Sequence, residues 1–256
     1  MKEELKITLR HLFVSFCFTL ILFPNFGHEL FAQSMNNRGD IPCHDLLNNK
    51  DEIYGSDIRL LNGEMYMPAN INAEGFPFLL QDEFIKGDLF IKDALYRNVL
   101  IKYDLVADRI ILHQNTIEGK PVTILLNTAF VDSVHLGGLK LVNTNELIGK
   151  DTLKNFVEVI YDNGFKFVSS HEKNFIGTYN NLTPYGSFSD ANTTYYILQN
   201  NQLSEIGNKR DLFRYFESDK KEIKEFLREN DIKFRKATRR ELKQLMDFCN
   251  KLKKEL

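Results

Sequence analysis

NFVEVIYDNGFKFVS, residues 155–169, is the stretch that decides the fold. Two short runs rich in β-branched and aromatic residues flank Asp162-Asn163-Gly164, a triplet with the composition of a tight turn. Both runs are too short for a typical helix, and apolar and polar residues alternate within them. The stretch therefore predicts two antiparallel strands joined as a β-hairpin.

The same pattern of short alternating runs and turn residues extends from Glu52 to about Gly207. An Asn62-Gly63 pair between two such runs predicts a further hairpin. We expect strands at 57–61, 64–67, 87–91, 95–103, 109–113, 121–126, 130–136, 194–198 and 203–206. This series predicts a mainly β protein of the α+β type, arranged as an antiparallel meander, a partly closed barrel or a sandwich.

The C-terminal part, residues 208–256, changes to helical spacing. Short helices are predicted at Asp211–Glu217 and Asp219–Asn230. A capping box, Thr238 to Glu241, then begins a longer helix. Its apolar stripe consists of Leu242, Leu245, Met246, Cys249 and Leu252. Because such a stripe must be buried, we expect this pair or trio of helices to pack on the β-rich domain, residues 52–207.

The first 32 residues have the parts of a secretory signal peptide. Lys2, Lys6 and Arg10 precede the uncharged run LFVSFCFTLILF, which is shorter than the ~20 residues of a membrane span. Cleavage after Ala32 is predicted, and residues 33–51 form a polar, turn-rich segment before the domain. We expect an exported protein of the periplasm or cell surface of a Gram-negative-type bacterium, with no transmembrane span after cleavage.

Charge is unevenly distributed along the chain. Residues 208–256 contain 16 Lys and Arg against 10 Asp and Glu, although the whole chain has a net charge of −2. A basic segment can bind nucleic acid or acidic lipid. Here the charges alternate in sign along predicted helices, which is typical of a solvated helix face, and an exported protein rarely meets nucleic acid. We therefore expect no nucleic-acid partner.

Two cysteines, Cys43 and Cys249, remain after cleavage of the signal peptide. In an oxidising compartment they could form a disulfide that closes a long loop, worth about 3–5 kcal/mol. Alternatively, Cys249 is a free thiol that packs as a small apolar residue on its helix stripe. The sequence leaves both alternatives open.

Several motifs resemble those of a set of uncharacterised exported bacterial cell-envelope proteins. They are Gly75-Phe76-Pro77-Phe78, Gly87, Tyr96-Arg97-Asn98-Val99 and Lys102-Tyr103-Asp104 with Asp108. That set shares a signal peptide, a β-rich meander, a later Tyr-Tyr strand and a Lys-rich helical C-terminus, as at Tyr195-Tyr196 and residues 209–254 here. The resemblance implies an envelope location and a β-rich fold, and it brings no known activity.

Tyr103, Asp104 and Asp108 form a polar cluster at a connection between two predicted strands. Paired carboxylates can hydrolyse glycosides when they face each other across a cleft, which would make the protein a secreted hydrolase of glycan or peptide. Aspartates at strand ends more often bond the backbone of a turn, and we favour that role.

Other reactive residues give weaker signals. Cys43-His44-Asp45 places a nucleophile, a base and an acid side by side, but neighbours in sequence usually point in different directions. His113, His135 and His171 lack the spacing of a metal site. We expect no metal, no cofactor and no catalytic residue among them.

The long segment Asn174–Thr194 is rich in Asn, Ser, Gly and Tyr. Its residues Tyr179, Asn181 and Tyr185 are the best candidates for a recognition surface, since Tyr and Asn are common in binding loops. An ordinary loop with its tyrosines packed on the sheet is the alternative. The favoured hypothesis is a non-catalytic binding or scaffolding protein whose partner is another envelope protein or a surface glycan. Carriage of an apolar ligand inside a barrel is a further alternative.

Overall fold

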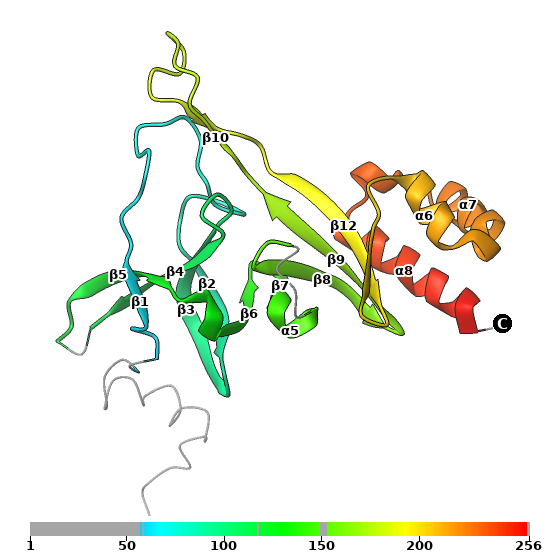
Figure 1. Ribbon diagram of the computed structural model, residues 1–256, viewed down its shortest axis with the longest axis horizontal. Helices are drawn as coiled ribbons and strands as arrows, with labels where there is room; N and C mark the ends of the chain where they lie inside the picture. The colour runs from blue at the N-terminus through cyan, green and yellow to red at the C-terminus, as the bar shows by residue number, and fades with distance from the viewer. Residues whose placement is uncertain (1–56, 58, 117, 149–152, 255–256) are drawn as a thin grey trace, which may run out of the picture. The chain divides into compact units, whose positions relative to one another are not determined.

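The structure is a computed structural model that describes residue 57 and residues 59–116, 118–148 and 153–254. These residues belong to one compact unit, positions 54–256. An antiparallel sheet comes first in the chain and helices follow it at the C-terminal end (Figure 1). The predicted fold class, a β-rich meander with a group of C-terminal helices, is confirmed.

The main sheet has eleven strands, all paired antiparallel in the order β1-β5-β4-β3-β2-β6-β7-β8-β9-β12-β13. Within the described residues β1 and β13 lie at opposite edges, so the sheet does not close into a barrel. The strands are β1 (Gly63–Met65), β2 (Ile85–Ile91), β3 (Ala94–Asp104), β4 (Arg109–Asn115), β5 (Pro121–Leu126), β6 (Val131–Leu136), β7 (Leu139–Asn143), β8 (Phe156–Asn163), β9 (Phe165–Glu172), β12 (Asn192–Gln199) and β13 (Gln202–Glu205).

The hairpin predicted at the deciding stretch is formed by β8 and β9. Gly164 turns the chain with a φ of 77°, a conformation that favours glycine. A Cβ atom at this position would also overlap the side chain of Asn250, which lies on the last helix. The turn thus needs glycine both for its backbone and for the close approach of that helix.

The hairpin predicted around Asn62-Gly63 is wrong. Residues 59–61 form a turn, and β1 pairs with β5 instead, with Gly63 opposite Leu126. Gly63 does not have a positive φ, as a two-residue hairpin turn would require. A Cβ at Gly63 would overlap the carbonyl of Leu125. Glycine is therefore needed here because the backbones of β1 and β5 approach each other closely.

Strand β7 was missed by the sequence analysis. It is only five residues long and follows the turn Gly137-Gly138, where φ is 56° and 81°. Short strands of this kind carry too few residues to show a period of two. It pairs with β6 and β8 and so joins the two halves of the sheet.

The helical elements follow β13, apart from η1 (Thr128–Phe130) and α5 (Thr144–Leu147). They are α6 (Lys209–Tyr215), η2 (Glu217–Asp219), α7 (Lys220–Glu229), η3 (Phe234–Lys236) and α8 (Arg239–Lys254). The predicted capping box at α8 is confirmed, because the Thr238 N–H donates to Glu241 Oε2 at 2.6 Å and the Glu241 N–H donates back to Thr238 Oγ1 at 3.3 Å.

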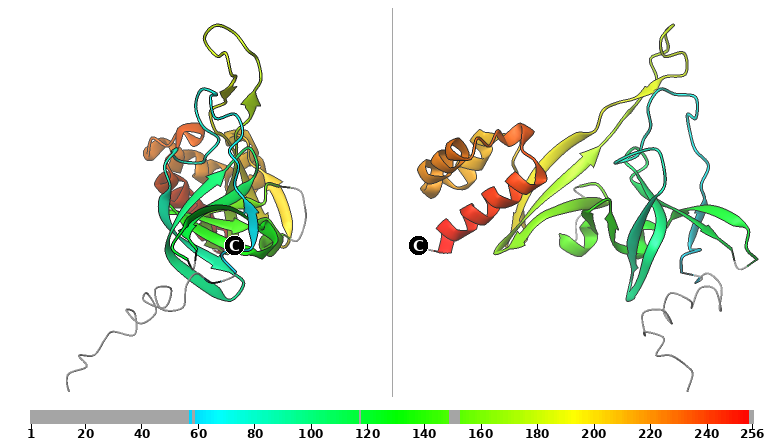
Figure 2. Two further views of the ribbon diagram at one scale, coloured as in Figure 1. Left: turned by 90° about the vertical axis from the view of Figure 1, so that its left-hand side faces the viewer. Right: turned by 180° about the vertical axis from the view of Figure 1, so that it is seen from behind.

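The helices pack on one part of the sheet, along β8, β9 and β12 (Figure 2). Phe165 and Phe167 of β9 share a core with Leu245, Met246 and Cys249 of α8, and all five are buried. The predicted stripe of α8 is therefore the face that contacts the sheet.

A second core lies beneath β2 to β7 and includes Leu89, Tyr103 and Phe156. Strand β8 reaches both cores, since Phe156 belongs to the second and Ile160 to the one under the helices. Glu158 occupies the position between these two residues and is 5% exposed. A charged side chain thus lies where the two apolar cores meet.

Candidate functional site

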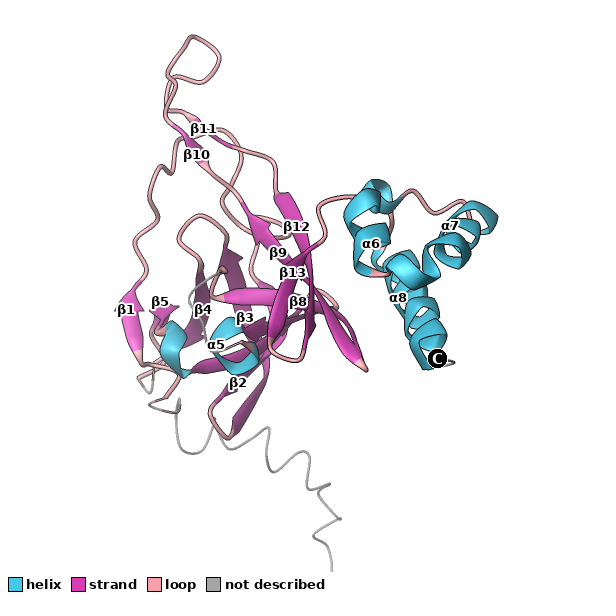
Figure 3. Ribbon diagram, turned by 45° about the vertical axis from the view of Figure 1, so that its right-hand side comes forward, coloured by secondary structure: helices cyan, strands magenta, loops and turns pink. Residues whose placement is uncertain are grey.

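A two-stranded ribbon, β10 (Phe175–Ile176) and β11 (Ser187–Phe188), carries a projecting loop away from the main sheet (Figure 3). We call residues 174–189 the tip. The rings of Phe175 and Phe188 are in contact, with centroids 5.5 Å apart. Gly186 has a φ of 81°, and a Cβ there would clash with the Phe175 ring at 2.6 Å. Aromatic packing and a glycine therefore fix the base of the tip.

The loop of the tip is held by its own hydrogen bonds. Asn180 Oδ1 accepts from the N–H groups of Leu182 at 2.8 Å and of Thr183 at 3.0 Å, and the Gly186 N–H donates to the Thr183 carbonyl at 3.1 Å. An Asn side chain used in this way forms a turn without any contact to the core. The loop therefore has a defined conformation, and its outward side chains remain free.

Those side chains are large and apolar. Leu182 is 90% exposed, Tyr179 is 66% exposed and Tyr185 is 59% exposed. Asn181 is exposed as well. The alternative in which the tyrosines pack back on the sheet is wrong for Tyr179 and Tyr185, because nothing in the described chain covers most of their surface.

A segment from the start of the domain is bonded to the tip. The Glu74 N–H donates to the Gly186 carbonyl at 3.0 Å, and the Phe188 N–H donates to the Glu74 carbonyl at 2.9 Å. Lys173 lies just below, donates to the Phe76 carbonyl at 2.8 Å and sits 4.1 Å from the centroid of the Phe76 ring. Burial lowers the pKa of Lys173.

The residues leading to that contact, 65–73, are a part of the surface that the sequence analysis missed. Met65, Met67 and Ile71 are each more than 70% exposed. Neither residues 65–73 nor residues 174–189 contain a charged side chain, in a protein with 27% charged residues. That absence of charge, together with three exposed apolar residues, is the signal that could have identified the segment. Interfaces between proteins are depleted of charge at their centre in the same way.

Tyr103, Asp104 and Asp108 lie together at the β3–β4 connection, as predicted. Asp104 Oδ1 accepts from the N–H groups of Val106 and Ala107, both at 2.9 Å. The turn role favoured for Asp104 is thereby confirmed. Burial raises the pKa of Asp104, although these two hydrogen bonds oppose it.

Asp108 fastens the same connection to the chain before β8. Its carboxylate accepts from the Tyr103 hydroxyl at 2.6 Å and from the Asn155 N–H at 2.7 Å. Burial raises the pKa of Asp108, and burial also raises the pKa of Tyr103 well above its usual range. Both carboxylates thus accept hydrogen bonds from donors of their own chain, an arrangement that stabilises the β3–β4 connection.

Glu158, Ser169 and His171 form a network that the sequence analysis did not connect. Glu158 Oε2 lies 3.1 Å from both Ser169 Oγ and His171 Nε2, while His171 Nδ1 bonds Thr193 Oγ1 at 3.1 Å. In a catalytic triad the serine and the acid bond different nitrogens of the histidine. Here both bond Nε2, and Ser169 is fully buried, so the network is structural.

Arg239 extends this network to the first turn of α8. Its Nε lies 2.6 Å from Glu158 Oε1, and another of its nitrogens donates to the Gly138 carbonyl at 2.6 Å. Burial raises the pKa of Glu158, but the hydrogen bond and charge of His171 and the charge of Arg239 outweigh burial and lower it overall. The network thus ties α8 to β8 and to the β6–β7 turn.

The three histidines weighed as metal ligands lie on separate strands. His113 bonds Thr123 and His135 lies beside the Phe90 ring, whereas His171 belongs to the network above. In the described part of the chain no group of His, Cys, Asp or Glu could hold a metal ion.

Cys249 has no disulfide partner among the described residues; it is buried in the core under the helices, and burial raises the pKa of its thiol to about 12. Cys43, the Cys43-His44-Asp45 triplet and the signal peptide lie outside the described residues, so the disulfide, the triplet and export stay predictions.

Comparisons with protein-family models, with curated proteins and with solved structures found no match to this chain. The resemblance to exported envelope proteins therefore stays a prediction from its motifs. Among the helices that the structure describes, none combines the length and the apolar character needed to cross a membrane.

Proposed function

We propose that the protein is an exported, non-catalytic binding protein of the bacterial cell envelope, and that it binds a partner protein through the tip and the adjoining segment 65–73. One observation carries the proposal. The described chain exposes ten large apolar side chains, and seven of them lie in these two segments: Met65, Met67, Ile71, Ile176, Tyr179, Leu182 and Tyr185.

The character of this surface supports a protein partner. Tyrosines and a leucine on a loop fixed by its own hydrogen bonds lose little conformational entropy on binding. The two segments themselves carry no charged side chain, so few of their groups must be desolvated without compensation, and the exposed carboxylate of Glu74 lies where they meet. Asn181 at the same loop offers an exposed amide for directional hydrogen bonds. The hydrolase alternative lacks comparable support, since Asp104 and Asp108 are occupied by backbone and tyrosine donors.

The proposal is tested with Leu182→Asp, which places a charge at the most exposed apolar position of the tip. The matched control is Leu95→Asp, on β3, where the leucine is also exposed but lies outside the two segments. Wild-type protein and Leu95→Asp should capture the same partner from an envelope extract. With that partner purified, Leu182→Asp should bind it at least about tenfold more weakly, as expected for an interface hot spot.

Equal binding by all three proteins would contradict the proposal, as would a partner lost by both variants. If the wild-type protein binds lipid vesicles that contain no protein, and Leu182→Asp does not, the tip binds a membrane surface and the proposal of a partner protein is wrong. Export is tested separately: the amino-terminal sequence of the protein isolated from the envelope should begin at Gln33.

A further inference from the structure

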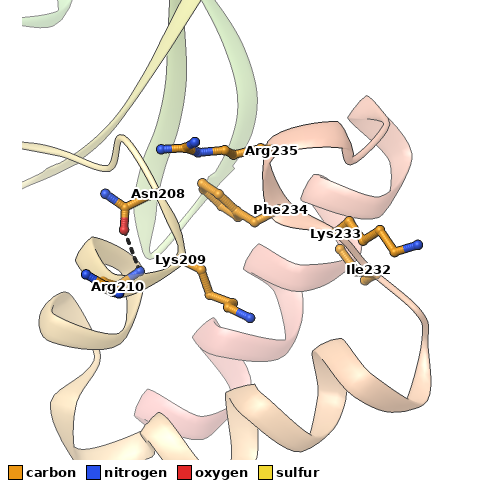
Figure 4. Close-up of a pocket in the computed structure, with 7 residues that line it drawn as sticks. All are labelled: Asn208, Lys209, Arg210, Ile232, Lys233, Phe234 and Arg235. Carbon is orange, nitrogen blue, oxygen red and sulfur yellow. Dashed lines mark hydrogen bonds between the residues drawn. The ribbon is translucent and has the colours of Figure 1, made fainter.

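A pocket of about 480 Å³ lies between the start of α6 and the segment that contains η3 (Figure 4). Asn208, Lys209 and Arg210 contribute from one side, and residues 232–235 contribute from the other. In Figure 4 the Arg235 and Lys209 side chains lie on either side of the Phe234 ring, whereas Lys233 points away. The pocket is remote in sequence from the tip, and nothing in the proposed function uses it.

One wall of the pocket is anchored in the core, and the other is fixed by hydrogen bonds at the start of α6. Ile232 and Phe234 are buried, and the Phe234 ring contacts Tyr195 of β12 edge-on with centroids 5.7 Å apart. On the opposite wall Asn208 Oδ1 accepts from the Arg210 N–H at 2.7 Å, and the Asn208 N–H donates to Asp211 Oδ2 at 3.1 Å. The backbone that carries the cationic side chains is therefore fixed, although the side chains reach solvent.

The charge of the pocket is of one sign. Its lining contains Lys209, Arg210, Lys233 and Arg235 and no carboxylate, and within the described residues none of these four forms an ion pair. Three cations elsewhere in the helical part do form ion pairs: Arg214 with Asp211, Arg239 with Glu158, and Lys251 with Asp247. The alternating charge expected for a solvated helix face thus gives way to a cluster of cations at this position.

A second groove of about 540 Å³ shares Lys209 and Ile232 with the pocket and continues along α7. It adds Lys221, Lys224 and Arg228, against the carboxylates of Glu225 and Asp231. Together the two hollows are lined by seven cationic and two acidic side chains. Uncompensated positive charge over a concave surface attracts anions and raises their local concentration.

We propose that this pocket binds a phosphate group, either of a small phosphorylated molecule or of a lipid head group. Arg235 can bond two phosphate oxygens at once with its planar guanidinium, and Lys209 adds a compact charge on the other side. The volume is within the range of small-molecule sites and exceeds that of one phosphate, so room is left for the group that the phosphate is attached to.

The test titrates inorganic phosphate into the purified protein at constant ionic strength, with chloride as the reference anion, and follows heat release. Wild-type protein should bind one phosphate per chain in a saturable manner. Arg235→Ala and Lys209→Ala should each weaken binding about tenfold, the loss expected for one charge-assisted hydrogen bond. The matched controls are Arg214→Ala and Lys251→Ala, which remove paired cations outside the pocket, and both should bind as wild type does. Thermal unfolding of every variant shows whether it is folded.

A second arm distinguishes the two sources of phosphate. If the ligand is a lipid head group, phosphatidylcholine vesicles that contain phosphatidic acid should bind the protein, and inorganic phosphate should compete with this binding. If only soluble phosphate binds, the ligand is a small molecule. Absence of saturable phosphate binding, or equal weakening in the pocket variants and the controls, would overturn the proposal.

Discussion

The substitution Glu158→Ala should destabilise the protein by about 3 kcal/mol at neutral pH. Hydrogen bonds to a charged acceptor contribute about 1.5–3 kcal/mol each, and Glu158 accepts two, from Ser169 and His171. Both donors keep a partner after the substitution, because Ser169 and His171 also bond each other at 3.2 Å. The ion pair with Arg239, whose side chain is 41% exposed, adds at most about 1 kcal/mol. The expected loss of about 3 kcal/mol is therefore at the low end of the ~3–5 kcal/mol that removal of one partner of a buried ion pair costs.

The pH dependence of this loss has a definite sign. The pKa of Glu158 is lower in the folded protein than its ordinary value of 4.5. The carboxylate therefore contributes its full stabilisation above about pH 4.5 and loses it as the pH falls through the folded-state pKa. Glu158→Gln has no carboxyl group to titrate. The difference in unfolding free energy between wild type and Glu158→Gln should be largest at pH 7 and should shrink below pH 4.5.

Urea unfolding of wild type and variants across this pH range measures the effect, and melting temperature gives an independent reading. For a domain of this size, about 3 kcal/mol corresponds to a fall of about 6–12 °C. Glu118→Gln makes the same chemical change in an exposed surface pair with Lys120 and should cost less than about 0.5 kcal/mol. A difference for Glu158→Gln that is the same at pH 3 and pH 7 would refute the assignment of the ion network.

Three further outcomes are expected. Asp104→Ala should cost about 2 kcal/mol, because two backbone N–H groups lose their acceptor, whereas Asp104→Asn keeps that acceptor and should cost much less; urea unfolding distinguishes them. Gly63→Ala should lower the melting temperature, since a Cβ overlaps the Leu125 carbonyl, and an unchanged melting temperature would show that β1 is not paired with β5. Cys249 should react with a thiol reagent only at the rate of unfolding; reaction within seconds in native buffer would place it at the surface.

Most of the sheet could be predicted because its strands have a clear alternation and strong turn residues. The β8–β9 hairpin shows both, and so does the β12–β13 hairpin, where Asn200 and Asn201 adopt the positive φ of 51° and 60° that such turns need. Alternation specifies which residues form strands but not which strands pair. Asn62-Gly63 has the composition of a turn, yet its glycine serves the pairing of β1 with β5, a contact between distant parts of the chain.

The candidate sites show the same limit. Tyr179 and Tyr185 could be predicted as candidate binding residues from the composition of their loop, because binding loops are rich in Tyr, Asn, Ser and Gly. That segment 65–73 joins them depends on the hydrogen bonds of Glu74 to the tip, which no local pattern encodes. The cationic pocket was missed for a similar reason. Lys209 and Arg235 are far apart in sequence, and their charges appear balanced by neighbours until the fold brings them to one hollow.

The way in which the tip is stabilised fits the proposed binding role. Elsewhere buried or half-buried carboxylates fasten the chain: Asp104 and Asp108 hold the β3–β4 connection, and Glu158 holds α8 through Arg239. The tip is held by the Phe175–Phe188 contact at its base, by hydrogen bonds to Glu74 and by the Asn180 hydrogen bonds within the loop. Its exposed side chains therefore contribute little to folding. A loop of this kind can change its outward residues without loss of stability, and it already has the conformation in which a partner would meet it, so that less ordering entropy is lost on association.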